Sequence, residues 1–437
     1  MKIPPQPPKF SADIDLDPAV RARVQADVGG RYLHWDEIRR RTPPAGLSHR
    51  AWWSAIAAAR RNLFRELPLW DATGAPFHVG LPDSVQRLTY GIDRQAGHSG
   101  SASALDRADG DRYLVSSLME EAITSSQLEG ASTTRRVAAD MLRKGRSPRT
   151  HGERMILNNY RAVEHVRDLV NEPLSPVLIL DLHRIAVGDS LAPRDVGRLR
   201  FPDEDIVVSD AGDGTILHQP PPAATLPERI TALCAFANGK TPDFFVHPIV
   251  RAILVHFWLA YDHPFVDGNG RLARLLYYWS VLRSGYGLLQ YASISSVLRG
   301  APARYNRSLL FVESDANDAT YFVFHQLEVI DRAQKKLAAH VRRKAEELLA
   351  TEKTLAVGDL NHRQIALLAH AVRHPEATYT IAGHQRSHRV VYQTARTDLL
   401  ELAQRGFLKK TRRGRAFVFV PAKDLKQRSP PAQTARI

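Results

Sequence analysis

Two apolar helices joined by a short polar loop constrain this 437-residue chain more than any other feature. The segments Pro248 to Tyr261 and Leu272 to Leu282 are apolar nearly all round, and a helix of that kind is surrounded by protein. Most other long segments also have helical spacing, with breaks at polar clusters such as Asp71 to Pro76. The sequence therefore predicts a mostly α-helical fold with these two helices at a domain centre.

The loop between the two helices, HPFVDGNGR, carries residue types that bind phosphate. Gly268 and Gly270 lack side chains, so backbone N–H groups can approach an anion, and the following helix N-terminus adds partial positive charge. Asp267 can hold Mg²⁺ between phosphates, because that ion prefers one or two carboxylates with phosphate oxygens and water. Arg271 and Arg274 share a helix face and can each donate two hydrogen bonds to phosphate. The loop predicts a phosphate cradle.

The stretch from His263 to Arg274 resembles the HPFx(D/E)GNGRxxR signature of Fic proteins at every fixed position. The resemblance implies a helical Fic core and transfer of AMP from ATP to a Ser, Thr or Tyr hydroxyl of a target protein. It also implies that His263 is the catalytic general base, and a neutral imidazole can accept such a proton near neutral pH. The other implied roles are loop anchor for Phe265, Mg²⁺ ligand for Asp267, and nucleotide ligands for Gly268, Asn269, Gly270, Arg271 and Arg274.

A β-hairpin is predicted from Asp205 to His218, where two short β-branched runs flank a Gly-Asp-Gly turn. The preceding Gly197-Arg-Leu-Arg200 is similar to the GxxR element that leads into the target-docking flap of the family. The flap residues implied by this resemblance are Ile206, Val207 and Val208.

A second motif lies upstream, on a predicted helix whose inward-facing residues recur at intervals of 4, 4, 3 and 4. An inward carboxylate at the end of this stripe needs a cation or hydrogen-bond donors. SSQLEG, residues 125–130, resembles the (S/T)xxxE(G/N) inhibitory motif of one Fic class, which implies that Glu129 pairs with Arg274 and withholds it from the γ-phosphate. An ordinary helix-end ion pair is the alternative. The stripe consists of Leu114, Leu118, Ala122, Ser125 and Glu129.

The formal net charge of +14 is concentrated at the C-terminus, where residues 361–437 contain 15 Lys/Arg and 4 Asp/Glu. Helical spacing at 362–373 and 391–402, followed by a hairpin with a cationic turn at 407–420, predicts a winged helix. Its cations favour DNA binding by counterion release, and a protein-docking domain with a solvated basic face is an equal alternative. A DNA-binding transcriptional regulator is thus a second function. The cations concerned are Arg389, Arg396, Lys409, Lys410, Arg412, Arg413 and Arg415.

The composition of the chain argues against several other classes of protein. One cysteine, Cys234, excludes an internal disulfide and a cysteine-rich zinc site. The chain has no signal-like N-terminus and no run of about 18 apolar residues, so we expect a cytoplasmic protein that does not enter a membrane. His247 and His256, on the first apolar helix, are expected to be hydrogen-bonded core residues.

The domains predicted are an N-terminal arm and helical region at 1–110, an inhibitory helix with connecting helices at 111–173, the Fic core at 174–333, a linker helix at 334–358, the winged helix at 359–426 and a flexible tail at 427–437. Because the loop binds phosphates and not the base, another nucleotidyl transfer stays open, as does removal of AMP from a modified target. A homodimer fits the resemblance.

Overall fold

The computed structural model describes residues 2–9, 23–97, 107–210, 212–356, 360–388, 390–413, 416–422 and 425. The chain divides into two compact units, Met1–Leu337 and Ala338–Ile437, and the long helix α15 (Thr320–Ala356) crosses the boundary. The predicted tail at 427–437 lies outside the described residues, and so do two of the predicted phosphate-binding cations, Arg389 and Arg415.

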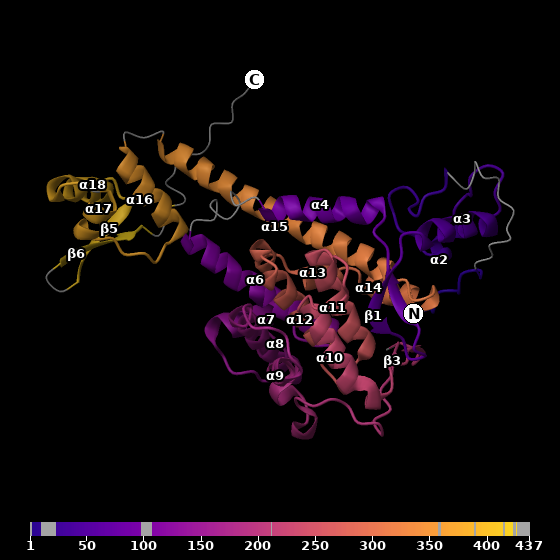
Figure 1. Cartoon of the computed structure of the whole chain (residues 1–437). Helices are drawn as coiled ribbons and strands as arrows, with labels where there is room; N and C mark the ends of the chain where they lie inside the picture. The colour runs from indigo at the N-terminus through magenta and orange to yellow at the C-terminus, as the bar shows by residue number, and fades with distance from the viewer. Residues whose placement is uncertain are drawn as a thin grey trace. The chain divides into compact units, whose positions relative to one another are not determined.

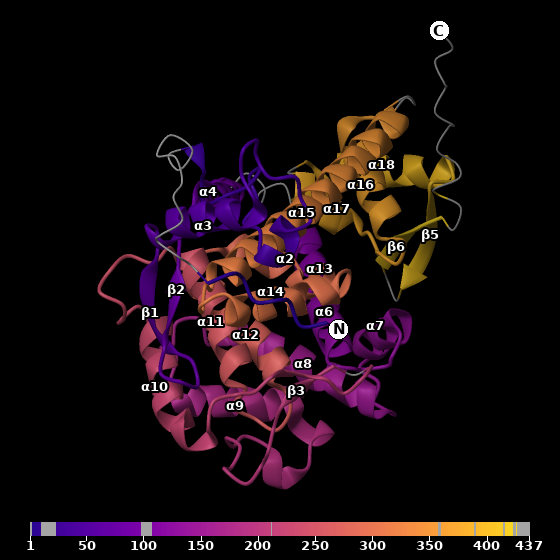
Figure 2. The same cartoon turned by 90° about the vertical axis from the view of Figure 1, so that its right-hand side faces the viewer.

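The centre of the first unit is formed by α11 (Pro248–Asp262) and α12 (Asn269–Arg283), which pack against each other. Both helices are buried on nearly all sides, and both views show them among the other helices of this unit (Figure 1, Figure 2). The prediction of a mostly helical fold around these two segments is confirmed. Helix α12 begins at Asn269 and not at Leu272, so three loop residues form its first turn.

The two histidines assigned to the core differ from each other. His256 is buried, and its Nε2 lies 3.0 Å from the Tyr305 hydroxyl. His247 contradicts the prediction, because it is the N-cap of α11: its Nδ1 accepts the Ile249 N–H at 3.3 Å, and its Nε2 lies 3.0 Å from an Asp93 carboxylate oxygen. A histidine before Pro248 is in a position to satisfy an N–H that the helix leaves unpaired.

The helices around this pair come from most of the first unit. Helix α6 contacts α8, α13 and α7, while α10 packs on α11 and α9 on α8. No helix in the parts of the chain that the structure describes is long and apolar enough to cross a bilayer. The helices are α2 (Trp35–Ile38), α3 (His49–Arg61), α4 (Asp83–Gly97), α6 (Arg107–Leu128), α7 (Arg135–Lys144), α8 (His151–Asp168), α9 (Pro176–Val187), α10 (Leu226–Ala237), α13 (Ile294–Arg299) and α14 (Pro302–Ser314).

Two short hairpins complete the first unit. The strands β3 (Val208–Ser209) and β4 (Ile216–His218) form the predicted antiparallel hairpin, with shorter strands than the sequence indicated. The strands β1 (Arg65–Trp70) and β2 (Pro76–Val79) form a hairpin that the sequence interpretation missed. The cluster from Asp71 to Pro76 was interpreted as a break between helices, whereas it is the turn of this hairpin.

The second unit contains α16 (His362–Arg373), α17 (Ile381–His388) and α18 (Tyr392–Gln404), followed by the antiparallel strands β5 (Leu408–Arg413) and β6 (Ala416–Pro421). Figure 2 shows these elements gathered together. The order of helices and hairpin is the predicted one, and assignment to the winged-helix class stays a prediction. The core of the unit includes Leu368, Leu399, Leu402, Leu408 and Phe419.

Candidate functional site

The loop between α11 and α12 starts with a non-glycine residue in the left-handed region. His263 has φ +44° and ψ +56°, and its N–H donates to the Leu259 carbonyl at 3.1 Å. Few non-glycine residues adopt this conformation, and they keep it only where surrounding contacts enforce it. Arg200 supplies them: its Nε donates to the His263 carbonyl at 3.0 Å, and its N–H donates to the Pro264 carbonyl at 2.9 Å. The GxxR element therefore fixes the corner that carries the predicted base.

The environment of the His263 imidazole keeps the ring neutral. The pKa of His263 is lowered to about 4, chiefly by burial and also by the nearby His218, while the Glu129 carboxylate opposes the shift. At neutral pH the ring therefore has a lone pair available to accept a proton.

The middle of the loop is held by the buried Phe265 ring, which stacks on His183 with 3.8 Å between ring centroids. Nδ1 of His183 accepts the Gly197 N–H at 3.0 Å, so Nε2 carries the proton and donates to the Asp267 carbonyl at 2.9 Å. His183, on α9, thus links the GxxR element to the loop. Sequence reasoning missed it, because a single histidine on an apolar helix carries no local signal of this contact.

Asn269 closes the loop on itself. Its side-chain oxygen accepts the Phe265 N–H at 3.0 Å, and its Nδ2 donates to the Phe265 carbonyl at 2.8 Å. Gly268 has φ +86°, and a Cβ there would lie 2.6 Å from Val187 Cγ1, so the position requires glycine. The two Asn269 hydrogen bonds show that the loop residues help to hold their own shape, and the Gly268 position shows how closely α9 packs on the loop. The predicted nucleotide-binding role of Asn269 would have to use its backbone.

Arg271 is fully buried in the first turn of α12. It donates to the Ala186 carbonyl at 2.9 Å and to the Asp267 carboxylate at 3.3 Å, and within the described residues nothing accepts from its Nε. The Asp267 carboxylate is 45% exposed, and its Oδ1 accepts the Gly268 N–H at 2.6 Å. A group of three metal-ligating side chains is absent from the described residues. One accessible carboxylate fits Mg²⁺ when phosphates and water supply the other ligands.

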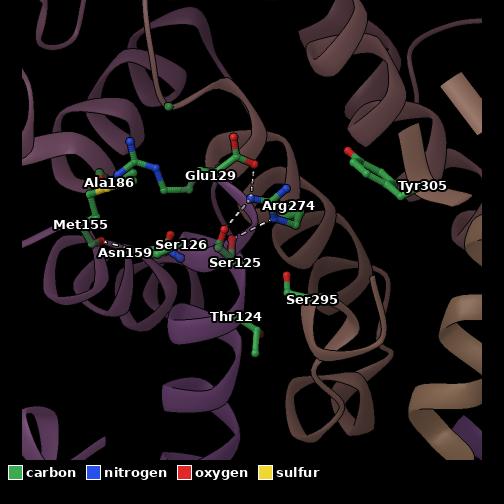
Figure 3. A network of polar contacts seen from close by, with 12 residues as sticks. Thr124, Ser125, Ser126, Glu129, Met155, Asn159, Ala186, Arg274, Ser295 and Tyr305 are labelled. Carbon is green, nitrogen blue, oxygen red and sulfur yellow. Dashed lines mark hydrogen bonds and ion pairs between the residues drawn. The ribbon is translucent and has the colours of Figure 1, made fainter. Parts of the chain in front are cut away.

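Arg274 is also buried and faces three acceptors at the end of α6 (Figure 3). Its Nε donates to Ser125 Oγ at 2.8 Å, and its Nη2 donates to the Ser125 carbonyl at 3.0 Å and to Glu129 Oε1 at 2.8 Å. The structure thus brings together the residues of the predicted inhibitory motif and the last arginine of the loop signature.

Glu129 lies one residue beyond α6 and is 28% exposed. Gly130, with φ +92°, ends the helix as predicted, and the Ala131 N–H donates back to the Ser126 carbonyl at 3.0 Å. A Cβ at position 270 would lie 2.1 Å from Glu129 Oε1. Glycine at 270 therefore lets the Glu129 carboxylate lie directly against the first turn of α12, where backbone N–H groups have no intrahelical partner.

The hairpin next to the loop is tied to the end of α11. His218, the last residue of β4, is buried: its Nε2 donates to the Tyr261 carbonyl at 2.7 Å, and its Nδ1 lies 2.9 Å from a Glu313 oxygen. Of the three predicted flap residues, Val208 lies in a strand, whereas Ile206 and Val207 precede it, and all three are half-buried.

The comparisons with known proteins agree with the resemblance of the loop to the signature of Fic proteins. Residues 173–280 match the family model described as the Fic/DOC family. The chain is 30% identical over 185 residues to "Protein adenylyltransferase Fic" of Nematostella vectensis, covering 42% of this chain and 40% of the relative. It is 29% identical over 204 residues to the protein of the same name from Aedes aegypti, covering 46% of this chain and 38% of the relative.

A solved structure described as a Fic family protein from Desulfovibrio desulfuricans G20 has a TM-score of 0.52 at 18% identity, covering 78% of this chain and 96% of that one. At that identity the likeness concerns the fold alone. Residues 173–280 are therefore similar to the Fic/DOC family, and the chain spans about two fifths of the length of the curated relatives it matches.

We predict that His263 stays neutral well below the pH at which an ordinary histidine is protonated. With a pKa of about 4, roughly 97% of the ring is neutral at pH 5.5, against about 9% for a pKa near 6.5. Titration of histidine-labelled protein by NMR, with the resonance assigned from its loss in His263→Ala, measures this fraction. Glu129→Gly should lower the midpoint further, because the Glu129 carboxylate raises this pKa. A midpoint near 6.5 would contradict the electrostatic description.

Proposed function

We propose that this chain is a protein adenylyltransferase that moves AMP from ATP to a Ser, Thr or Tyr hydroxyl of a target protein. The observation that carries the proposal is a neutral His263, fixed at a corner next to a helix N-terminus, with the buried guanidinium groups of Arg271 and Arg274 on that helix. The names of the matched relatives support the reaction class.

In the proposed reaction, the neutral imidazole of His263 accepts the hydroxyl proton of the target while the hydroxyl oxygen attacks the α-phosphorus of ATP. The bond from that phosphorus to the bridging oxygen breaks, AMP stays on the target, and pyrophosphate leaves. Backbone N–H groups of the first turn of α12 and the two arginines stabilise the negative charge of the phosphates. The hydrogen bonds that Arg200 donates to the His263 and Pro264 carbonyls hold the backbone that carries the base.

Asp267 is the residue that would hold Mg²⁺, since its carboxylate is accessible and lies next to the glycines of the loop. When bound, the ion neutralises charge on the phosphates. The protein target would add to one edge of the β3–β4 hairpin by main-chain hydrogen bonds, as in β-augmentation. A homodimer and a cytoplasmic location belong to the same proposal.

Glu129 would act as a brake on this reaction. It accepts from Nη2 of Arg274, the arginine that the proposal assigns to the γ-phosphate, and it lies against Gly270, where phosphate would approach the helix. Two unit charges about 4 Å apart attract by about 4 kcal/mol at an effective dielectric near 20, before desolvation. Part of that energy is enough to disfavour productive ATP binding.

The reaction itself is tested by His263→Ala. We expect loss of AMP transfer with ATP binding largely retained, because the imidazole acts on the hydroxyl and not on the phosphates. Intact-mass analysis after incubation with ATP and Mg²⁺ reports AMP addition on the protein, and calorimetry reports ATP binding. Parallel incubations with GTP, CTP and UTP test nucleotide choice. Unchanged AMP addition in His263→Ala would overturn the assignment of the base.

The brake is tested by Glu129→Gly. AMP transfer should rise by at least about tenfold, which corresponds to roughly 1.4 kcal/mol of transition-state stabilisation. Arg274→Ala should stay poor in either background, since removal of the brake cannot restore a phosphate ligand. A purified AMP-modified target separates the alternative role: if Glu129 serves AMP removal, Glu129→Gly loses that activity while it gains transfer. No change in either direction would leave Glu129 as a helix-end ion pair.

Nucleic-acid binding by the second unit is the other candidate function. Helix α18 exposes Tyr392, Gln393 and Arg396, and β5 exposes Lys409, Lys410 and Arg412. The Lys410 ammonium lies 3.9 Å from the centroid of the exposed Phe417 ring. A helix face with polar and cationic residues beside a cationic hairpin supports contacts to a phosphate backbone.

This candidate is tested on the full chain. Fluorescence anisotropy with duplex DNA should show binding that weakens steeply with salt, and Lys409→Gln with Lys410→Gln should reduce both affinity and the salt slope. His263→Ala is the matched control and should bind DNA as the parent does. Salt-independent binding, or no binding at low salt, would favour protein docking by this unit.

A further inference from the structure

The buried carboxylate of Glu121 lies on α6, two turns before Glu129, and is 3% exposed. Its Oε2 accepts from the Tyr278 hydroxyl at 2.9 Å, the Ser293 hydroxyl at 2.8 Å and the Ser295 N–H at 3.1 Å, and its Oε1 accepts from the Ser295 hydroxyl. These donors belong to α12 and to the start of α13. Within the described residues no cation forms a direct ion pair with Glu121, so hydrogen bonds are its direct polar contacts, and the charge of Arg274 acts on the carboxylate from a longer distance.

Glu121 belongs to a regular ladder between two helices. Glu121 and Ser125 on α6 and Glu129 one residue beyond its end follow at intervals of four. On α12 their partners Tyr278, Arg274 and Gly270 descend by four. Residues four apart share one face of a helix. The three pairs therefore lie about one helical turn apart along an antiparallel contact between the two helices, with Glu121 at one end and Glu129 at the other.

The two ends of this ladder differ in how firmly they are held. At the Glu121 end, four donors from two elements converge on a buried carboxylate. At the Glu129 end, the carboxylate is 28% exposed, has one hydrogen bond to Arg274 and lies beyond the last residue of the helix. A shift of α6 along α12 by one helical turn would move Glu129 by about 5.4 Å. The position of Glu129 therefore depends on the contacts that fix the alignment of α6 with α12.

We propose that Glu121 is the register anchor of the inhibitory helix, a positioning residue that acts on the site through Ser125 and Glu129. The inference rests on the proposed function, because the anchor matters for activity only if Glu129 restrains AMP transfer. Loss of the anchor leaves the three donors of Ser293 and Ser295 without this acceptor, while the Tyr278 hydroxyl keeps the Ala292 carbonyl at 3.0 Å. The last turns of α6 can then move away from Arg274.

Three variants test the anchor. In Glu121→Ala, AMP transfer should rise roughly three- to tenfold, because the population with Arg274 held by Glu129 falls. Glu121→Gln should behave almost as the parent, since its carbonyl oxygen can replace Oε2 and its amide can donate to the Ser295 hydroxyl. Glu120→Ala is the matched control: it removes a neighbouring carboxylate that pairs with Arg135 at 2.5 Å, and it should leave transfer unchanged.

The double variant Glu121→Ala with Glu129→Gly separates positioning from general destabilisation. It should be no more active than Glu129→Gly, because Glu121 then has no Glu129 carboxylate to position. An equal fold-change in both backgrounds, or a loss of transfer in both, would overturn the proposal. So would a rise in Glu121→Gln as large as in Glu121→Ala.

Hydrogen exchange supplies a readout that does not depend on the chemistry. The N–H groups of Glu129 and Ala131 donate to the Ser126 carbonyl, and their exchange in the nucleotide-free protein should accelerate in Glu121→Ala but not in Glu120→Ala. Unchanged exchange would overturn the anchor. If Glu129→Gly and every other variant lack AMP transfer, the proposed function fails, and the exchange measurement alone then decides whether Glu121 holds the helix.

Discussion

Two guanidinium groups buried at the start of α12 impose the constraint on which the rest of the site depends. Arg271 is 0% exposed and Arg274 is 1% exposed, and a buried cation is tolerated only with acceptors in place. Arg271 obtains them from the Ala186 carbonyl and the Asp267 carboxylate. Arg274 obtains them from the end of α6. The two arginines therefore obtain their acceptors from α9, from the loop and from the end of α6. In the proposed reaction, phosphates would take the place of the acceptors at the end of α6.

The parts of this arrangement that could be predicted are those encoded within short stretches of sequence. The two apolar helices and the loop could be recognised because burial on all sides and glycine spacing are local patterns. The end of α6 could be located because Gly130 follows the inward stripe directly. The β1–β2 hairpin has only a weak local signal, since the buried Leu67 and Leu69 alternate with less buried neighbours over a run too short to outweigh the flanking helical spacing.

The contacts that fix the site could not be predicted, because they join residues far apart in the chain. His183 contacts Asp267 across 84 positions and Arg200 contacts His263 across 63. No pattern around His183 or Arg200 identifies the backbone group that each one binds. The same holds for Glu121: its spacing to Ser125 and Glu129 can be read from the sequence, but its donors follow more than 150 residues later.

The division of contacts around Arg274 determines how the proposed brake would work. The proposed brake depends on a competition between Glu129 and phosphate for Nη2 of Arg274, and the Glu129 carboxylate, 28% exposed, keeps only part of its hydration while it holds this position. The Ser125 hydroxyl accepts from Nε of Arg274, and the Ser125 backbone carbonyl accepts from Nη2. A substitution of the Ser125 side chain would remove only the first of these hydrogen bonds. Since Ser125 still holds Arg274 without Glu129, full release requires the end of α6 to move, which makes the position of the helix as important as the charge on it.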